Sequence, residues 1–196
     1  TETSPLLTLA PPRGEEREIG SIGKALPGAE IRLVDEQGND VPRDEPGELI
    51  VRGPKVFSGY YGNPELTARV IKDGWFHTKD VAKQDEDGFY YHLGRLDDLI
   101  ITGGLNVFPA EVEAAAAQHP HVKEAVVYAV PDASRGQAIG MDVCPCEGCE
   151  IDPDELRGFL QNHLAAYKTP KHIHRVEAIS HTPTGKPIRK PKQGAS

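Results

Sequence analysis

The stretch from Gly94 to Glu113 combines residue types that could bind an oxygen-rich ligand. Arg95 is a permanent cation whose flat donor fork suits phosphate or hydroxyl oxygens. Gly103 and Gly104 permit positive φ and let a thin ligand or another backbone approach closely. Paired glycines more often mark only a turn, so a strand, a turn and a helix without chemistry are the alternative interpretation.

The same stretch contains the elements that would position these residues. The apolar run 99–101 follows Asp97-Asp98, so a strand is predicted to begin there. Pro109 suits the first position of a helix, and Glu111 and Glu113 favour the positive end of that helix. The glycine pair is therefore expected between a strand and a helix.

Five segments, of which four carry candidate site residues, together resemble the adenylate-forming superfamily, which includes acyl-CoA and aryl-CoA synthetases, luciferases and the adenylation domains of peptide synthetases. GRLDDLIITGGLNVFPAEVE resembles its hinge and glycine-loop motif, and residues 182–189 are similar to its Pro-x-x-Gly-Lys motif. Thr1-Glu2 looks like the end of Tyr-Gly-x-Thr-Glu, and residues 75–80 resemble aromatic-x-Thr-Gly-Asp. The resemblance runs from Thr1 to Lys190, in the family's order, and covers about the last third of a family member.

The resemblance implies a role for each matched residue in the first half-reaction. Lys186 would be catalytic, because an ammonium offsets the repulsion between a carboxylate and the α-phosphate of ATP. Thr1 would contact the nucleotide phosphate, and Glu2 would help to hold Mg²⁺, for which a carboxylate is a suitable hard ligand. Asp80 would accept hydrogen bonds from both ribose hydroxyls, and Arg95 would also bind the nucleotide.

The resemblance also implies a second half-reaction that depends on rotation of the carboxy-terminal domain about a hinge at Asp97. Rotation would withdraw Lys186 and bring Gly103-Gly104 to line a channel for the phosphopantetheine thiol of coenzyme A. Lys168 and Lys171 are candidate contacts for the phosphates of coenzyme A, with plain surface charges as the alternative.

Some positions depart from the family pattern or have a structural interpretation. Lys79 stands where glycine is usual, and its side chain could crowd the nucleotide or point to solvent. Leu105 stands where the family commonly has Glu. Gly59 and Tyr60 lie in a segment similar to an architectural motif of the family, so packing and turn roles are expected for them.

The cysteines and the composition limit the function classes. Cys144, Cys146 and Cys149 could belong to a metal site, but structural zinc needs four ligands and the fourth would have to be distant, for example His163. Loop cysteines are the preferred interpretation, and an odd number of cysteines favours a reducing cytoplasm over a disulfide framework. A net charge of −8 argues against a nucleic-acid binder. No apolar run approaches the roughly 18 residues of a transmembrane segment.

The pattern of the chain indicates an α+β fold with two parts. In residues 1–96, short strands with frequent turns indicate a small β-barrel-like subdomain, with a hairpin at Asp87-Gly88 and a short helix after Asn63. Residues 97–196 alternate strands and helices, as a compact α+β domain does. The resemblance makes this second part a mobile domain with its hinge near Asp97. We expect a three-stranded sheet in it, with strands near residues 124–130, 137–143 and 173–179 and helices near 109–118 and after Asp152.

The chain is thus interpreted as the carboxy-terminal part of an ATP-dependent acid–CoA ligase, with a carboxylic acid, ATP, Mg²⁺ and coenzyme A as its implied ligands. It begins at Thr1 without an initiator Met, so we expect it to start inside a longer protein whose amino-terminal domain is the partner. The chain alone is expected to be inactive, because the family's phosphate loop lies upstream. An adenylation domain that loads a carrier protein and a non-enzymatic binding module that retains the fold are the alternatives.

Overall fold

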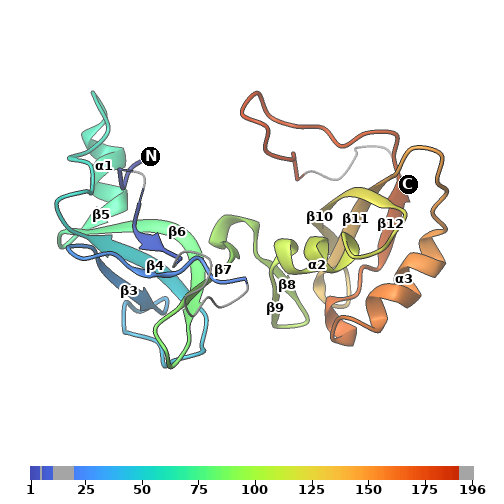
Figure 1. Cartoon of the computed structure of the whole chain (residues 1–196), viewed down its shortest axis with the longest axis horizontal. Helices are drawn as coiled ribbons and strands as arrows, with labels where there is room; N and C mark the ends of the chain where they lie inside the picture. Colours follow the sequence, from blue (N-terminus) through green and yellow to red (C-terminus); the bar gives the residue numbers. More distant parts are fainter. Residues whose placement is uncertain (5, 11–19, 190–196) are drawn as a thin grey trace. The chain divides into compact units, whose positions relative to one another are not determined.

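The computed structural model describes residues 1–4, 6–10 and 20–189. Lys190, the last residue of the family resemblance, lies outside them. The chain divides into two compact units, Thr1–Asp97 and Asp98–Ser196 (Figure 1). No helix among the described residues is long and apolar enough to cross a membrane.

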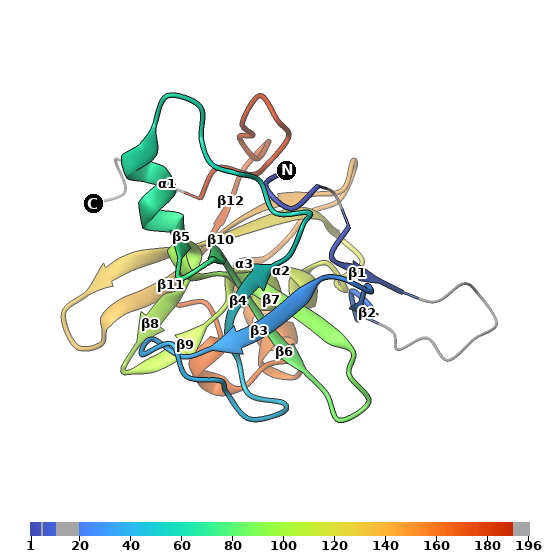
Figure 2. The same cartoon turned by 90° about the vertical axis from the view of Figure 1, so that its left-hand side faces the viewer.

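Unit 1 is built on a five-stranded antiparallel sheet with the order β3-β4-β6-β5, and β7 also pairs with β6 (Figure 2). Its core contains Leu49, Val51 and Ala82. The predicted hairpin at Asp87-Gly88 joins β6 to β7. The elements are β1 (Thr8–Leu9), β2 (Lys24–Ala25), β3 (Glu30–Val34), β4 (Gly47–Arg52), α1 (Pro64–Val70), β5 (Ile71–Lys72), β6 (Trp75–Gln84), β7 (Tyr90–Arg95) and the 3-10 turn η1 (Leu96–Asp98).

Helix α1 begins where the sequence predicts it. The side chain of Asn63 accepts a hydrogen bond from the Leu66 N–H at 3.0 Å, and Pro64 occupies the first turn. Both features are typical of a helix start, because they satisfy or remove N–H groups that have no partner within the helix.

Unit 2 contains a five-stranded sheet with the order β10-β11-β8-β9, and β12 pairs with β11 in parallel. The α+β class is therefore confirmed, but the predicted count of three strands is wrong. The two additional strands form the hairpin of β8 and β9, which joins β11 through the pair Gly136 and Thr102. The apolar run 99–101 predicts β8 as a strand but not its place in this sheet, and β9 has only three residues, too few for a clear periodicity. The elements are β8 (Ile100–Thr102), β9 (Leu105–Val107), α2 (Pro109–Ala116), β10 (Val122–Asp132), β11 (Gly136–Pro145), α3 (Pro153–Gln161), the 3-10 turn η2 (Ala166–Lys168) and β12 (His172–Arg175).

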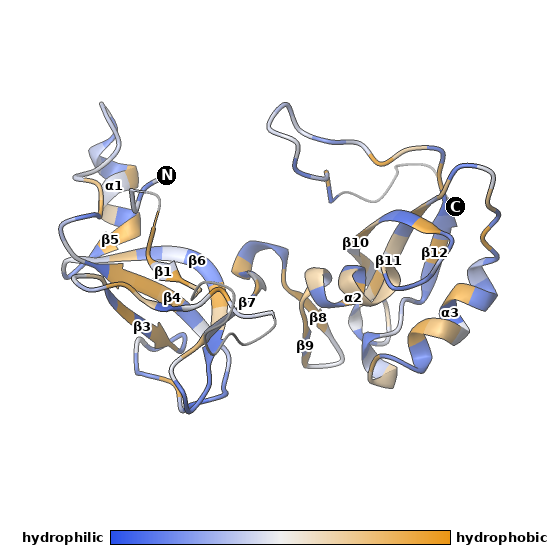
Figure 3. Ribbon diagram, in the orientation of Figure 1, coloured by the Kyte–Doolittle hydropathy of each residue, from blue (hydrophilic) through white to orange (hydrophobic). Residues whose placement is uncertain are grey.

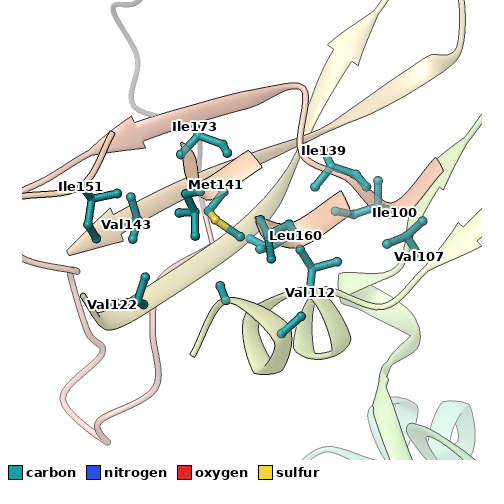
Figure 4. Packing of buried hydrophobic residues seen from close by; sticks show 14 residues of the cluster. Ile100, Val107, Val112, Val122, Ile139, Met141, Val143, Ile151, Leu160 and Ile173 are labelled. Carbon is teal, nitrogen blue, oxygen red and sulfur yellow. The ribbon is translucent and has the colours of Figure 1, made fainter. Parts of the chain in front are cut away.

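The core of unit 2 forms between this sheet and the two helices (Figure 4). Leu156 and Leu160 of α3 are fully buried, and Figure 3 shows both hydrophobic and hydrophilic residues on this helix, as expected for an amphipathic helix that packs on a core. Met141 and Val143 of β11 pack in the same cluster.

Candidate functional site

One cavity of unit 1 is lined by five of the residues that the sequence identifies as candidates. It has a volume of about 670 Å³. The amino-terminal segment contributes two of these residues, and β6, β7 and η1 contribute one each. The five residues are Thr1, Glu2, Asp80, Arg95 and Asp97. Residues that lie up to 96 positions apart in the sequence therefore meet in one place.

A bulge in β6 sets the direction of the Asp80 side chain. The pairing of β4 with β6 shifts register between Glu48 and Ile50. The Thr78 hydroxyl donates to the Leu49 carbonyl at 2.6 Å and accepts the Asp80 N–H at 3.0 Å. A bulge of this kind re-aims a side chain at the edge of a regular ladder.

Asp80 lies opposite Arg95 in the β6–β7 pairing. Arg95 Nη1 donates to Asp80 Oδ1 at 3.3 Å, and His92 Nε2 lies 3.5 Å from the same oxygen. The sequence analysis did not identify His92. Its only signal is its place three residues before Arg95 on the strand that pairs with the Asp80 strand.

Lys79 adopts a left-handed backbone with φ of 60°, which favours glycine. Its N–H donates to Glu48 Oε1 at 3.0 Å. Its Nζ lies 2.9 and 3.1 Å from the two carboxylate oxygens of Asp97. The side chain that replaces the usual glycine therefore pairs with the candidate hinge residue.

Glu2 is held by Tyr60, whose hydroxyl donates to Glu2 Oε1 at 3.0 Å. The Glu2 carbonyl accepts the Phe57 N–H at 2.8 Å. A backbone N–H and the Tyr60 hydroxyl hold the pKa of Glu2 below its usual range. Tyr60 packs edge-on against Phe57 as well, so it combines the expected packing role with a polar contact that the sequence did not reveal. The result is an ionised, two-thirds buried carboxylate that fits one ligand position of a hard cation.

Gly103 and Gly104 form the two-residue turn between β8 and β9. Their φ angles are 58° and 80°, and two positive φ values in succession are typical of the hairpin turn that matches strand twist. A Cβ at either position would meet nothing within 4 Å in this unit. Backbone conformation alone therefore accounts for both glycines within the unit, and Leu105 after them is 47% exposed.

Lys186 lies at the end of a tight turn after β12. The Lys186 N–H donates to Thr182 Oγ1 at 3.1 Å, and the Lys186 carbonyl accepts the Thr182 N–H at 2.8 Å. Its side chain is exposed, and among the described residues no ion pair involves its ammonium. The amine is therefore displayed at the surface of unit 2.

Lys168 and Lys171 both have carboxylate partners. Lys168 Nζ lies 2.6 Å from Glu111 Oε1, and Lys171 Nζ lies 2.5 Å from Asp132 Oδ2. Lys171 and the Ser134 hydroxyl hold the pKa of Asp132 well below its usual range. A bound phosphate would have to share these ammonium groups with the carboxylates.

The three cysteines are free, and Cys144 is buried. Its thiol lies 3.2 Å from the Glu177 carbonyl oxygen. Within the part of the chain that the structure describes, no three His, Cys, Asp or Glu side chains are grouped as a metal site would require.

Two family models match the chain. That of the AMP-binding enzymes matches residues 1–61, and that of the AMP-binding enzyme C-terminal domain matches residues 111–186. Together they cover more than half of the sequence. The chain belongs to the AMP-binding enzyme family.

The relatives and solved structures agree with this assignment. The chain is 40% identical to a feruloyl-CoA synthase of an Amycolatopsis species over 189 residues. This alignment covers 96% of this chain and 38% of that protein. It resembles the o-succinylbenzoate CoA synthetase of Bacillus subtilis in complex with its acyl-adenylate, with a TM-score of 0.85, 31% identity, and coverage of 91% and 36% of the two chains. The amide bond synthetase of Marinactinospora thermotolerans gives a TM-score of 0.81 at 39% identity, with coverage of 86% and 35%. The chain thus spans little more than a third of the length of these proteins.

Proposed function

We propose that the chain is the carboxy-terminal part of an ATP-dependent acid–CoA ligase that works in the cytoplasm. The observation that supports this most strongly is the convergence of Thr1, Glu2, Asp80, Arg95 and Asp97 on one cavity. A mixture of carboxylate, guanidinium and hydroxyl groups suits a nucleotide, which offers ribose hydroxyls and phosphate oxygens. The relatives that are named as CoA ligases support the same reaction class.

In this proposal the cavity of unit 1 binds the nucleotide. Asp80 accepts hydrogen bonds from the ribose hydroxyls, and Arg95 fixes the Asp80 carboxylate from the neighbouring strand. Thr1 contacts the phosphate. Glu2, whose carboxylate accepts a hydrogen bond from Tyr60, would hold Mg²⁺, and the bound ion would neutralise part of the phosphate charge.

Lys186 serves the first half-reaction. A carboxylate oxygen of the acid bonds to the α-phosphorus of ATP, and the bond from that phosphorus to the bridging oxygen breaks, so that pyrophosphate leaves with the bonding electrons. The Lys186 ammonium lies between the two anions and stabilises the charge that develops between them. Its exposure on unit 2 leaves it free to enter a site that other parts of the protein complete.

Unit 2 serves the second half-reaction after it rotates about Asp97. The coenzyme A thiol gives its proton to water and its sulfur bonds to the acyl carbon. The bond from that carbon to the phosphate oxygen breaks, and AMP leaves with the bonding electrons. The Gly103-Gly104 turn lines the path of the thiol arm, where a side chain would obstruct it. Lys168 and Lys171 contact the phosphates of coenzyme A in competition with Glu111 and Asp132.

Kinetics of a longer protein that carries this chain test the nucleotide site. Asp80→Ala should raise the KM for ATP at least about tenfold, because it removes hydrogen bonds from the ribose to a charged acceptor. The matched control is Asp44→Ala, which removes an exposed carboxylate of the same unit that pairs with Lys83. A KM for ATP that is unchanged in Asp80→Ala would contradict the assignment.

The acceptor is tested by thioester formation. We expect acid-dependent release of pyrophosphate, followed by transfer to free coenzyme A and not to a phosphopantetheinylated carrier protein. Transfer to the carrier protein alone would favour an adenylation domain, and no pyrophosphate release would favour a binding module. The 196-residue chain alone should release no pyrophosphate.

A further inference from the structure

Lys186 is carried by a short hairpin formed by residues 180–188, called here the Lys186 hairpin. His181 and Pro187 are paired across it, and the Ile188 N–H donates to the Ser180 carbonyl at 2.8 Å. Gly185 closes the tip, where its N–H donates to the Thr182 carbonyl at 2.9 Å. The hairpin is part of the red segment that follows β12 in Figure 1. Its own hydrogen bonds fix its shape but not its place on unit 2.

Arg189 connects the outgoing arm of the hairpin to two other elements. Its guanidinium pairs with both carboxylate oxygens of Glu113 on α2, with Nη2 lying 2.9 Å from Oε2. Nη1 also donates to the Val127 carbonyl of β10 at 3.1 Å. Glu113 Oε1 accepts the Val127 N–H at 2.7 Å. The side chains of Arg189 and Glu113 are only 22% and 17% exposed, so the network is largely shielded from solvent.

Two further ion pairs complete the attachment. Arg189 Nε lies 3.5 Å from Asp98 Oδ2, and Asp98 is the first residue of unit 2. On the incoming arm, His181 Nε2 lies 2.6 Å from Glu124 Oε1 of β10. Both arms are therefore fixed to unit 2, and the arm that follows Lys186 is held by the stronger, forked contact.

We propose that Arg189 is a positioning residue that holds the Lys186 hairpin at a fixed place on unit 2. This inference rests on the proposed function of Lys186. A lysine side chain is flexible, so the place of its ammonium depends on the backbone that carries it. Because one guanidinium joins the base of the hairpin to Glu113, Val127 and Asp98, the hairpin moves with unit 2 as one body. Lysine at position 189 could not reproduce the fork, because an ammonium is a point charge.

The attachment is tested on the 196-residue chain by amide hydrogen exchange. In Arg189→Met, the amides of Thr182, Gly185 and Ile188 should exchange at least about tenfold faster than in the parent chain, since the opening of the hairpin no longer breaks a charged network. The control is Arg175→Met, which removes a similar forked pair with Glu150 away from the hairpin and should leave these amides unchanged. Equal exchange in the parent and in Arg189→Met would overturn the proposal. If Arg189→Met does not fold, Arg189→Lys and Glu113→Gln provide the same comparison.

The positioning role is tested on the longer protein by separate half-reactions. Arg189→Met should lower the kcat of adenylate formation about 10- to 100-fold with little change in the KM for ATP, because a small misplacement of a catalytic group is sufficient for such a loss. The kcat of Arg189→Lys should lie between those of the parent and Arg189→Met. In both variants, thioester formation from supplied acyl-adenylate should be unchanged. An equal loss in both half-reactions would indicate a merely structural residue and overturn the proposal. If Lys186→Ala loses adenylate formation while Arg189→Met retains it, the proposed function stands and only the role of Arg189 fails.

Discussion

At the scale of single residues, Lys79 combines a strained backbone with a weak stabilising contact. Left-handed backbone costs a residue other than glycine about 1–2 kcal/mol. The pair that Lys79 forms with Asp97 is exposed, with side chains 51% and 55% accessible to solvent. Such pairs contribute at most about 1 kcal/mol. The strain at Lys79 is therefore larger than the gain from its ion pair.

We predict that Lys79→Gly stabilises unit 1 by about 0.5–1 kcal/mol, because glycine adopts the required φ without strain. Lys79→Ala is the matched control, since it loses the ion pair but keeps the strain. Denaturant unfolding of the three chains provides the comparison. A glycine variant less stable than the alanine variant would show that the ion pair, and not the backbone, determines the stability here.

The lowered pKa of Asp132 predicts how the stability of the chain depends on pH. Its pKa is lower in the folded chain than in the unfolded chain, so its contribution to stability is present above about pH 4 and is lost as the pH falls further. Lys171→Met removes the largest cause of the lowered pKa and should reduce the loss of stability between pH 6 and pH 3. Urea midpoints at the two pH values measure this, with Lys123→Met as an exposed lysine control. The same pH dependence in Lys171→Met and in the parent would contradict the prediction.

At the scale of elements, the turn between β8 and β9 depends on its two glycines. Gly104→Ala should lower the free energy of unfolding by about 1–2 kcal/mol, because its φ of 80° is left-handed and no steric contact opposes the new methyl group. Gly158→Ala in α3 is the matched control, for which the free energy of unfolding should change in the opposite direction. It should stabilise the chain by about 1 kcal/mol, since this glycine lies within a helix. Thermal unfolding measures both, and an unchanged midpoint in Gly104→Ala would contradict the conformational explanation.

The elements that the sequence predicts well are those with strong local signals. Asn63-Pro64 and Asp152-Pro153 mark helix starts, and the apolar run 124–130 marks β10. The contacts that arrange the candidate site lack such signals. Tyr60 and Glu2 are 58 residues apart, and Arg189 and Glu113 are 76 residues apart, so only the tertiary fold pairs them. The apolar run 99–101 also predicts β8, but no local signal marks β9 or the pairing of the β8–β9 hairpin with β11.

At the scale of the whole molecule, the proposed division into two domains predicts separate unfolding. Leu160 is fully buried in unit 2, and Trp75 in unit 1 is the only tryptophan of the chain. Leu160→Ala should destabilise unit 2 by about 2–5 kcal/mol and leave the unfolding transition seen by Trp75 fluorescence unchanged. Leu49→Ala in the core of unit 1 should shift that transition instead. If both variants moved the fluorescence transition equally, the two units would form one cooperative domain.

The proposed nucleotide groups and the proposed catalytic amine belong to different units of the chain. Asp80 and Arg95 line the cavity of unit 1, whereas Lys186 is exposed on unit 2. The proposed mechanism therefore requires unit 2 to present Lys186 in one half-reaction and a different surface in the other. Substitution of Lys186 should therefore slow adenylate formation and leave thioester formation unchanged.

The most direct measurement compares the two half-reactions of Lys186→Ala in a longer protein that carries this chain. Adenylate formation, followed as acid-dependent exchange of labelled pyrophosphate into ATP, should fall at least about 100-fold, as expected for the loss of a group that stabilises transition-state charge. Thioester formation from supplied acyl-adenylate and coenzyme A should stay within about threefold of the parent, because the proposed rotation withdraws Lys186 before that step. Lys123→Ala, an exposed lysine of the same unit, should change neither rate. An equal loss of both half-reactions in Lys186→Ala would contradict the proposed division of labour.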